Sequence, residues 1–493
     1  MNSTSIDNIA ARPNGVIKAK LSRDDIIMRG GMAVIALYLV ISLVFPLYAM
    51  FSKSFSTFQY DLSKFEVQVS DDAGQFSPAK ANLQNLNDGL QALSNAELST
   101  GSGGRLGVTV FFPDFSFRSP VMYRIRNVDQ QGRFLVGSTL VTGTDWQELD
   151  SNNFRRVQLR PLRSTGLSNF INYFSTPALF KSIQNSIFIS IISTIITVIL
   201  AFWFAYALNR SCMRFKGFFR LIAMAPILVP SLLPGIALVY LFGAQGVIKG
   251  LLFGASIYGP IGIIIGSVFF TFPHAFLIIS TALAISDARL YEAAVSLKAS
   301  AWKTFWTVTI PGARYGIVSA AFVVFNLVIT DFGLPKVIGG QFNVLAVDIY
   351  KQVIGQQNFE MGAVVSVVLI IPAILAFAID RFVQSKQVAL LTARSVPFHP
   401  KPSTKTDLTF TIYCALVGFF IVGILGICQF AALIKFWPYD LSLSLNNYQF
   451  DKMDGGGWAA YYNSIKMALL TALIGTCVIF FGAYLVEKSS GFK

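Results

Sequence analysis

Long runs of apolar residues without charge are the feature that most constrains this chain. Each run is close to the about 20 residues that a helix needs to cross a bilayer. Of the 493 residues, 54% are hydrophobic and only 13% are charged, whereas soluble proteins carry about 25% charged residues. We therefore predict an all-α polytopic membrane protein with about eight transmembrane helices. The predicted spans are approximately 32–51, 185–208, 218–242, 257–285, 315–330, 362–379, 409–434 and 463–486.

The formal net charge of +14 is explained by topology rather than by nucleic-acid binding. The basic residues gather at the ends of the predicted spans. The N-terminal arm and the loops after the second, fourth and sixth spans hold four or five Lys and Arg each, and the other short loops hold one or two. Short loops rich in Lys and Arg stay in the cytoplasm. This alternation predicts a cytoplasmic N-terminus and is consistent with eight spans.

The segment 52–184 then lies outside the membrane. Residues 106–112 and 134–141 are rich in β-branched and aromatic side chains, and Gly, Pro and Ser interrupt them. We predict a small β-containing extracytoplasmic insertion there. The sequence leaves two roles open for it, a structural insertion or a docking surface for an external partner.

Cysteine and histidine usage gives no sign of a metal site or a catalytic centre. The four cysteines lie in or next to apolar spans, and the two histidines are far apart in sequence. Neither set has the spacing of metal ligands or of a disulfide framework. The first apolar span is too long for a removable signal peptide, so we expect it to remain as an anchor.

The chain also repeats itself. Shifted by 278 residues, Leu167–Ser211 aligns without a gap on Leu445–Ser489, and Asn-Ser opens the following span in both copies. The simplest account is a tandem duplication whose second copy stops after two spans. We therefore expect a fragment of a longer two-copy protein, with a naturally short form as the alternative. The expected organisation is an N-terminal arm (1–31), a first transmembrane helix (32–51), the insertion (52–184), a first core (185–379) with a loop at 286–313, a cytoplasmic linker (380–408) and a truncated second copy (409–493).

The loop after the fourth span carries the strongest functional signal. Residues 292–301 are good helix formers, and small residues on one face would let another surface approach the backbone. An aromatic cluster follows, and Pro311 should end the segment before the next span. The pattern indicates a short amphipathic helix at the cytoplasmic face, which typically binds in a groove of a partner.

This loop resembles the EAA loop of binding-protein-dependent ABC permeases. The family pattern is Glu-Ala-Ala, three residues, Gly, nine residues and then aliphatic-x-aliphatic-Pro. Glu292, Ala293, Ala294 and Pro311 fall in register here, but Lys298 stands where the family has Gly. The segment Asp331–Pro335 and the two-copy organisation are most similar to the fused ferric-iron and 2-aminoethylphosphonate permeases.

The resemblance implies a transport subunit of the bacterial inner membrane that is not itself an enzyme. It would work with two cytoplasmic ATP-binding subunits and a periplasmic solute-binding protein. The chain has no phosphate-binding loop of its own, so we expect no cofactor on this chain and ATP on the partner subunit. The expected docking residues are Glu292, Ala293, Ala294, Leu297, Lys298 and Pro311.

Candidates for the translocation path are weaker. Pro226, Pro230 and Pro234 recur every four residues, which predicts a kinked helix that either lines the path or only packs. Asp331 lies near the outer end of a span, where it could attract a cationic substrate, contact the binding protein or be a simple interfacial residue.

Other functions fit less well. An ion-coupled secondary transporter would also have repeats and broken helices, but the spans hold almost no ionisable residues. A membrane-embedded enzyme would need a histidine pair, an acidic cluster or a nucleophile elbow. The substrate stays open among ferric iron, 2-aminoethylphosphonate, polyamines and thiamine.

Overall fold

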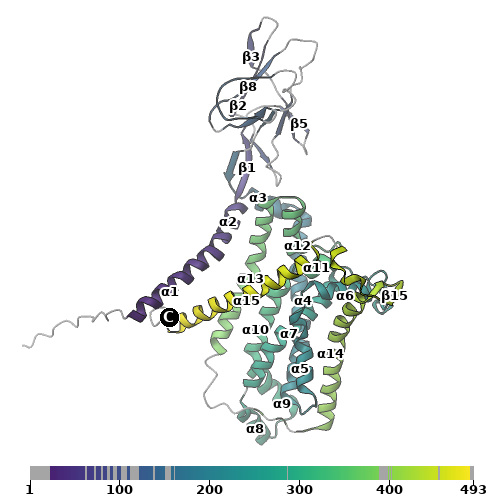
Figure 1. Cartoon of the computed structure of the whole chain (residues 1–493). Helices are drawn as coiled ribbons and strands as arrows, with labels where there is room; N and C mark the ends of the chain where they lie inside the picture. The colour runs from purple at the N-terminus through teal and green to yellow at the C-terminus, as the bar shows by residue number, and fades with distance from the viewer. Residues whose placement is uncertain are drawn as a thin grey trace, which may run out of the picture. The chain divides into compact units, whose positions relative to one another are not determined.

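The computed structural model is mainly helical, with a β-rich region near the N-terminal side (Figure 1). The predicted fold class, an all-α polytopic membrane protein with a small β-containing insertion, is confirmed. The predicted arm (1–31), linker (380–408) and strand segment (106–112) fall partly outside the described residues. The structure describes residues 23–61, 64–70, 74–78, 82–85, 89–92, 97–100, 108–111, 122–130, 132–136, 139–149, 157–159, 162–285, 287–387, 398, 400, 402–452 and 456–488.

Within these residues, seven helices are long and apolar enough to cross a membrane, and a bent pair of helices adds an eighth apolar segment. Each corresponds to one predicted span. The largest boundary difference is at the fifth span, predicted at 315–330, where the helix already begins at Ala301. The seven are Ile26–Ser54 (α1 Arg23–Leu39, η1 Val40–Val44 and α2 Phe45–Ser54), α4 (Pro177–Arg210), α7 (Pro260–Ile285), Ala301–Ile329 (α9 Ala301–Thr304, η6 Phe305–Thr309 and α10 Ile310–Ile329), α13 (Phe359–Gln387), α14 (Thr404–Ala432) and α15 (Gly457–Lys488).

The third predicted span, 218–242, is not one helix. It divides into α5 (Lys216–Met224), the 3-10 turn η4 (Ala225–Leu228) and α6 (Leu232–Phe242), and the two parts are bent by 103°. Val229 has extended backbone angles, φ −120° and ψ 136°. The residue before a proline is driven out of the helical region, and Pro230 follows it. The sequence predicted a kink, and the structure shows a break.

Short elements connect the spans. Each of them is too short to cross the membrane. They are α3 (Ser168–Ser175), η5 (Lys249–Leu252), α8 (Ala288–Ser296), α11 (Gly333–Ile338), α12 (Leu345–Tyr350), η7 (Lys351–Gly355), η9 (Asn446–Tyr448) and η10 (Phe450–Lys452).

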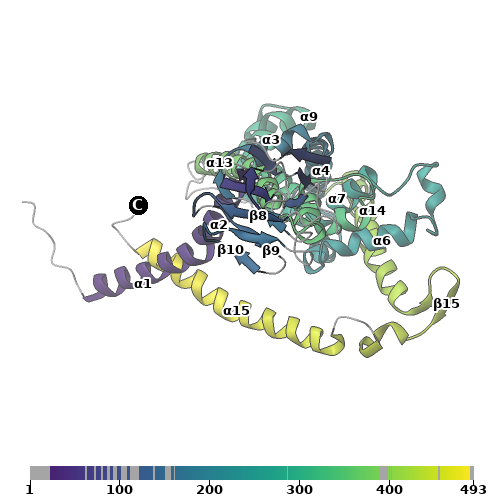
Figure 2. The same ribbon diagram turned by 90° about the horizontal axis from the view of Figure 1, so that it is seen from above.

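The core of residues 50–448 is built on α4, α7 and α10, which pack against one another (Figure 1). A stripe of buried Ser and Thr side chains runs along α4, and Thr197 exchanges a hydrogen bond of 3.2 Å with Thr271 of α7. Small polar residues allow close helix packing in a bilayer. Figure 2 shows α14 next to α6, and the two helices are in contact.

Short antiparallel strands make up the β-rich region. Residues 134–136 and 139–141 pair as two antiparallel strands. The sheets have the orders β13-β1-β6, β10-β9-β12-β7-β4-β5 and β11-β8-β2-β3. The strands are β1 (Ser56–Asp61), β2 (Phe65–Ser70), β3 (Phe76–Pro78), β4 (Asn82–Asn85), β5 (Gly89–Ala92), β6 (Glu97–Thr100), β7 (Val108–Phe111), β8 (Tyr123–Asn127), β9 (Phe134–Val136), β10 (Thr139–Val141), β11 (Gln147–Leu149), β12 (Val157–Leu159) and β13 (Leu162–Thr165).

A second short ribbon follows α14. Strands β14 (Ile434–Phe436) and β15 (Asp440–Leu443) pair antiparallel in it. The side chain of Asn447, just after the ribbon, donates to the carbonyls of Ala432 (3.3 Å) and Ile434 (2.8 Å). These bonds tie the ribbon back to the end of α14.

The residues before 50 and after 448 form a separate compact unit. In it α1 packs against α15, and Gly31 of α1 faces Leu485. No residue of α15 is buried. Such helices, apolar all round and exposed, are suited to a lipid environment.

Candidate functional site

The loop after α7 forms a short helix, α8, whose start is fixed by Asp287. This residue is the N-cap, and its carboxylate accepts a hydrogen bond of 3.1 Å from the backbone N–H of Arg289. Such a cap stabilises a helix by about 1 kcal/mol. Tyr291 and Ala294 are buried on one face of α8, whereas Glu292 and Ala293 are exposed on the other.

The C-terminal end of α8 differs from the sequence prediction. The helix was expected at 292–301, but α8 runs from Ala288 to Ser296. Lys298 has φ +51° and therefore lies in the left-handed region. The backbone N–H groups of Lys298 and Ala299 return to the carbonyls of Val295 (2.9 Å) and Ala294 (3.0 Å). This arrangement ends the helix. Lys298, which stands at the glycine position of the family pattern, is the left-handed turn residue here.

The next segment leads directly into a membrane span. Ser300 caps α9, because its hydroxyl accepts from the backbone N–H of Lys303 (3.2 Å). Pro311 was expected to end the segment, but the helix continues from Ala301 to Ile329. A π-turn, η6, precedes the proline, and the N–H of Ile310 donates to Phe305 O, five residues back. Proline removes one i→i−4 bond, and the wider turn accommodates this loss.

An aromatic cluster anchors this segment to α4. The buried ring of Phe305 stacks on Trp203, with the ring centroids 5.4 Å apart and the planes 2° apart, and it also meets Phe202. Trp302 and Trp306 stay 68% and 53% exposed, and Leu297 is 81% exposed. Large apolar groups that stay exposed next to a short helix are typical of an interaction surface.

Arg210, the last residue of α4, contacts both α7 and α8. Its guanidinium donates to the carbonyl of Leu283 at the end of α7 (2.8 Å). The same group lies 4.8 Å from the ring of Tyr291 and 4.5 Å from the ring of Phe398 in the linker. Sequence reasoning interpreted Arg210 only as a topology signal, because an arginine at a span end gives no indication of its partners.

Tyr291 also reaches the span that follows. Its hydroxyl donates to the hydroxyl of Thr309, at 3.1 Å in a buried position. Thus α8 is attached to the ends of α4 and α7 through Arg210 and to the start of α10 through Thr309. We define Glu292, Ala293, Leu297 and Lys298 as the docking face.

Four of the expected docking residues, Glu292, Ala293, Leu297 and Lys298, are exposed on α8 or just after it. Pro311 is exposed as well, but it lies in α10. Ala294 is different, because only 8% of it is exposed and it faces the interior. Its small side chain lets α8 lie close to the rest of the protein.

The three prolines expected on one helix face are separated by the break. Pro226 lies in η4 and is buried, Pro230 lies at the break and is exposed, and Pro234 is buried in α6. They therefore cannot form a continuous stripe along one helix.

Asp331 is engaged within the protein. Its carboxylate accepts from the backbone N–H of Gly333 (3.2 Å) at the start of α11 and from the hydroxyl of Ser231 at the break. Burial raises the pKa of Asp331 above its ordinary value, and these bonds oppose the rise. The side chain therefore connects α11 to the broken span.

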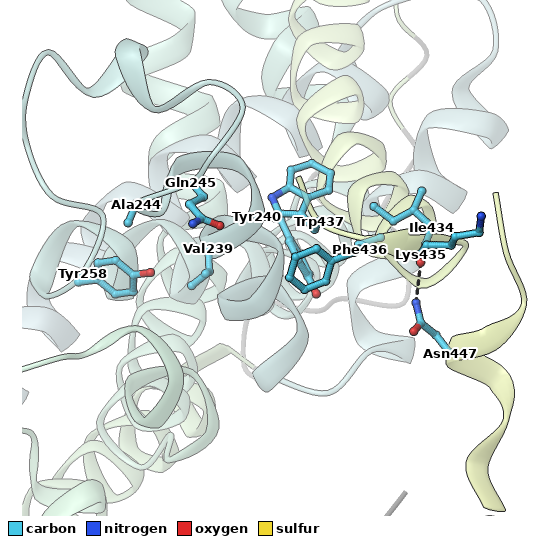
Figure 3. Close-up of a pocket in the computed structure, with 11 residues that line it drawn as sticks. Val239, Tyr240, Ala244, Gln245, Tyr258, Ile434, Lys435, Phe436, Trp437 and Asn447 are labelled. Carbon is cyan, nitrogen blue, oxygen red and sulfur yellow. Dashed lines mark hydrogen bonds between the residues drawn. The ribbon is translucent and has the colours of Figure 1, made fainter. Parts of the chain in front are cut away.

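A pocket of about 530 Å³ lies between α6 and the ribbon after α14 (Figure 3). Tyr240 packs edge-on against Trp437 with centroids 5.2 Å apart, and Gln245 donates to the hydroxyl of Tyr439 (2.8 Å). Neither the three prolines nor Asp331 line this pocket. Among the described residues, no group of three His, Cys, Asp or Glu is placed to hold a metal ion.

Part of this helical core is similar to a known protein family. Residues 198–388 match the family described as "Binding-protein-dependent transport system inner membrane component". This part of the chain is similar to that family of transport components. The match includes α7, the docking face and α10, so the resemblance stated from the loop motif is confirmed.

Several transport permeases are similar in sequence. A ferric transport system permease protein of Actinobacillus pleuropneumoniae is 25% identical over 327 residues, covering 62% of this chain and 47% of its own length. A putative ferric transport system permease protein of Haemophilus influenzae is 24% identical, covering 62% and 51%. A molybdenum transport system permease protein of Azotobacter vinelandii is 28% identical, covering 33% and 75%. The chain thus spans about half the length of the two ferric relatives.

Proposed function

We propose that this chain is the permease subunit of an ATP-driven importer in a bacterial inner membrane. The single observation that carries the proposal is the exposed docking face on α8, inside the region that matches the permease family. In this proposal two cytoplasmic ATP-binding subunits hydrolyse ATP, and an extracytoplasmic solute-binding protein delivers the substrate. The chain itself binds no ATP and carries out no covalent chemistry.

The mechanism follows from how α8 is attached. A partner that binds the docking face and moves α8 also pulls on Arg210, and hence on the ends of α4 and α7. It pulls on α10 through the bond between Tyr291 and Thr309. These three helices form the packed core, so the movement is passed on to the helices that cross the membrane. Rigid-body shifts of this kind are common in switching proteins.

The orientation of the chain is part of the proposal. A cytoplasmic N-terminus and a cytoplasmic α8 are supported by the Lys and Arg bias of the short loops. We retain the division into a first core at 185–379 and the start of a second copy at 409–493. The β-rich region then faces the outside.

For the substrate we propose ferric iron. Support comes from two ferric transport permeases, which match over 62% of this chain. Permeases for molybdenum and for spermidine and putrescine match over smaller shares. Uptake of radioactive ferric iron by cells with and without the protein tests this choice, with 2-aminoethylphosphonate and spermidine as the competing substrates. Uptake of one of these in place of iron would refute the iron assignment.

The docking face is tested by purifying the full chain with its partners in mild detergent. Glu292→Lys reverses the charge at the centre of the exposed side of α8. Glu148→Lys, on an exposed position of β11, makes the same charge change in the outer region and is the matched control. We expect an ATPase to copurify with the wild type and the control and to be lost from Glu292→Lys.

The outcomes separate the possibilities. Retention of the ATPase by Glu292→Lys would show that docking does not depend on this face. If no ATPase copurifies with any form at any nucleotide concentration, the importer proposal fails. An ion-coupled transporter, which needs no such subunit, would then be the better model.

A further inference from the structure

Two parts of the chain that are far apart in sequence show the same pattern of hydrogen bonds. The amide of Asn169 donates to the carbonyls of Ser54 (3.3 Å) and Ser56 (2.8 Å), where the first span ends. The amide of Asn447 donates to the carbonyls of Ala432 and Ile434, at the same two distances, where α14 ends. Asn169 and Asn447 are also paired by the sequence repeat.

The strands next to these asparagines agree in register. Ser56 pairs with Thr165 between β1 and β13, and Ile434 pairs with Leu443 between β14 and β15. The next backbone bond also matches, from Gly166 N to Phe55 O in one place and from Ser444 N to Leu433 O in the other. The β1–β13 pair and the β14–β15 ribbon are therefore equivalent structures.

The two ribbons differ in what lies between their strands. The asparagine and the first carbonyl that it binds are separated by 115 residues in the first ribbon and by 15 residues in the second. The first ribbon thus carries 100 additional residues. Because the second ribbon closes without them, these residues are not required to form the membrane core, and they form a separate addition on the outer side.

One face of the sheet β11-β8-β2-β3 carries two arginines in almost the same setting. The Nε and Nη2 groups of Arg126 donate to the Glu66 carboxylate, at 2.9 and 2.6 Å. The same groups of Arg124 donate to the Gln68 amide oxygen, at 3.0 and 2.6 Å. The Trp146 ring lies 4.4 Å from one guanidinium and 4.5 Å from the other.

The two arginines differ in charge compensation. Arg126 forms a salt bridge with Glu66. Arg124 is hydrogen-bonded only to a neutral amide. Glu148 stands opposite it on β11, but no carboxylate of the described residues lies within 4 Å of its guanidinium. The Phe76 ring also lies 3.8 Å from the Arg124 guanidinium, and Arg124 is half-buried. Arg124 is therefore a fixed, partly accessible positive charge whose orientation is set before any partner arrives.

We propose that the 100-residue addition is a docking module for the solute-binding protein and that Arg124 binds a carboxylate on that protein. The inference rests on the proposed function for the existence of this partner. A planar guanidinium that contacts two aromatic rings is suited to carboxylate recognition, and its fixed orientation reduces the entropy lost on binding. The module's attachment through an outer ribbon places it where only an extracytoplasmic partner can reach it.

The experiment uses the full chain in lipid nanodiscs with its ATPase subunits. The probe is the purified solute-binding protein that stimulates ATP hydrolysis by this complex. Gln68→Glu gives Arg124 the same carboxylate partner that Arg126 has, and Arg124→Gln removes the charge. We expect each change to weaken binding of the probe at least about tenfold, a difference of about 1.4 kcal/mol. We also expect the salt dependence of binding to become smaller.

A charge-swapped variant tests whether the position of the carboxylate, rather than the net charge, decides binding. Glu66→Gln with Gln68→Glu keeps the net charge but moves the carboxylate from Arg126 to Arg124. If Arg124 is the contact, this variant also binds weakly, and a wild-type affinity in all three variants overturns the proposal. Copurification of the ATPase with every variant shows that the importer proposal stands even when docking fails. Loss of the ATPase from the wild type would instead count against the proposed function.

Discussion

The hydroxyl of Tyr291 lies 3.1 Å from the hydroxyl of Thr309, and both residues are buried. This bond joins the short helix α8 to the turn that leads into α10. The ring of Tyr291 also lies beneath the Arg210 guanidinium. One side chain therefore connects the docking face with the membrane core on two sides.

Removing this hydroxyl should weaken the attachment of α8. Tyr291→Phe leaves the ring in place but leaves the buried Thr309 hydroxyl without its donor, which costs about 1–3 kcal/mol. We expect a lower thermal midpoint of the purified protein and reduced retention of the ATPase. Circular dichroism melts and copurification measure the two effects.

The double variant Tyr291→Phe with Thr309→Val is the control for this bond. It removes both partners together, and replacing both by apolar groups is close to neutral. We expect its thermal midpoint to lie above that of Tyr291→Phe. The single variant Thr309→Val is measured as well. If the changes in thermal midpoint of the two single variants simply add up in the double variant, the bond is not the link between α8 and α10.

Lys298 should be replaceable by glycine with a gain in stability. Its φ of +51° is unfavourable for a residue with a Cβ atom by about 1 kcal/mol, and glycine adopts this conformation freely. We expect Lys298→Gly to raise the thermal midpoint, and Lys298→Val to lower it. Lys303→Gly, inside α9, is the control and should be destabilising by about 1 kcal/mol. A lower midpoint for Lys298→Gly would contradict this account of the turn.

The sequence was sufficient to predict the spans and the loop. Uncharged runs reveal spanning segments directly, because a bilayer tolerates few ionisable groups. The loop could be placed because Glu292 and Pro311 lie at a fixed spacing. The β-containing insertion was predicted as well, and residues 134–136 and 139–141 pair as strands in it.

Other features depend on contacts that no local pattern reveals. The prolines 226, 230 and 234 suggested one helix face, but the conformation of Val229 breaks the helix. The end of α8 at Ser296 depends on the left-handed turn at Lys298, a position where lysine gives no turn signal. The role of Arg210 requires residues 283, 291 and 398 to meet, which only the folded chain shows.

Asp331 gives a prediction with a defined pH dependence. Burial raises its pKa in the folded protein, so its contribution to stability is fully present below the ordinary value of about 3.9. That contribution is lost as the pH rises through the higher folded-state value. In Asp331→Asn the side-chain amide does not titrate, but its oxygen can still accept from Gly333. We therefore expect Asp331→Asn to melt at a higher temperature than wild type at pH 7 and at nearly the same temperature near pH 4.

Asp440 is the control for the sign of this effect. Hydrogen bonds from Ser442 lower its pKa, so its contribution is present at neutral pH and is lost as the pH falls through the lowered value. Asp440→Asn should therefore melt slightly below wild type at pH 7. If the difference in melting temperature between Asp331→Asn and wild type does not change between pH 4 and 8, the effect of the substitution is not electrostatic.

Gly316 of α10 lies in close contact with α7. A Cβ atom on this residue would lie 2.3 Å from the Cβ of Ala282, and both residues are buried. A methyl group has no other rotamer, so the two helices must separate. Gly316→Ala should therefore destabilise the protein by about 1–3 kcal/mol. Under the proposed mechanism, in which α7 and α10 carry the movement of α8, it should also reduce uptake. Gly423→Ala on α14 meets nothing within 4 Å and is the control.

A compensating change decides whether this contact is the cause. Gly316→Ala with Ala282→Gly moves the methyl group from one helix to the other and leaves the volume at the crossing unchanged. We expect the double variant to recover most of the thermal stability and uptake that Gly316→Ala loses. Recovery in the double variant, with no effect of Gly423→Ala, would locate the loss at the crossing of α7 and α10. A double variant as unstable as Gly316→Ala would mean that Gly316 is needed for backbone freedom in α10 and not for its contact with α7.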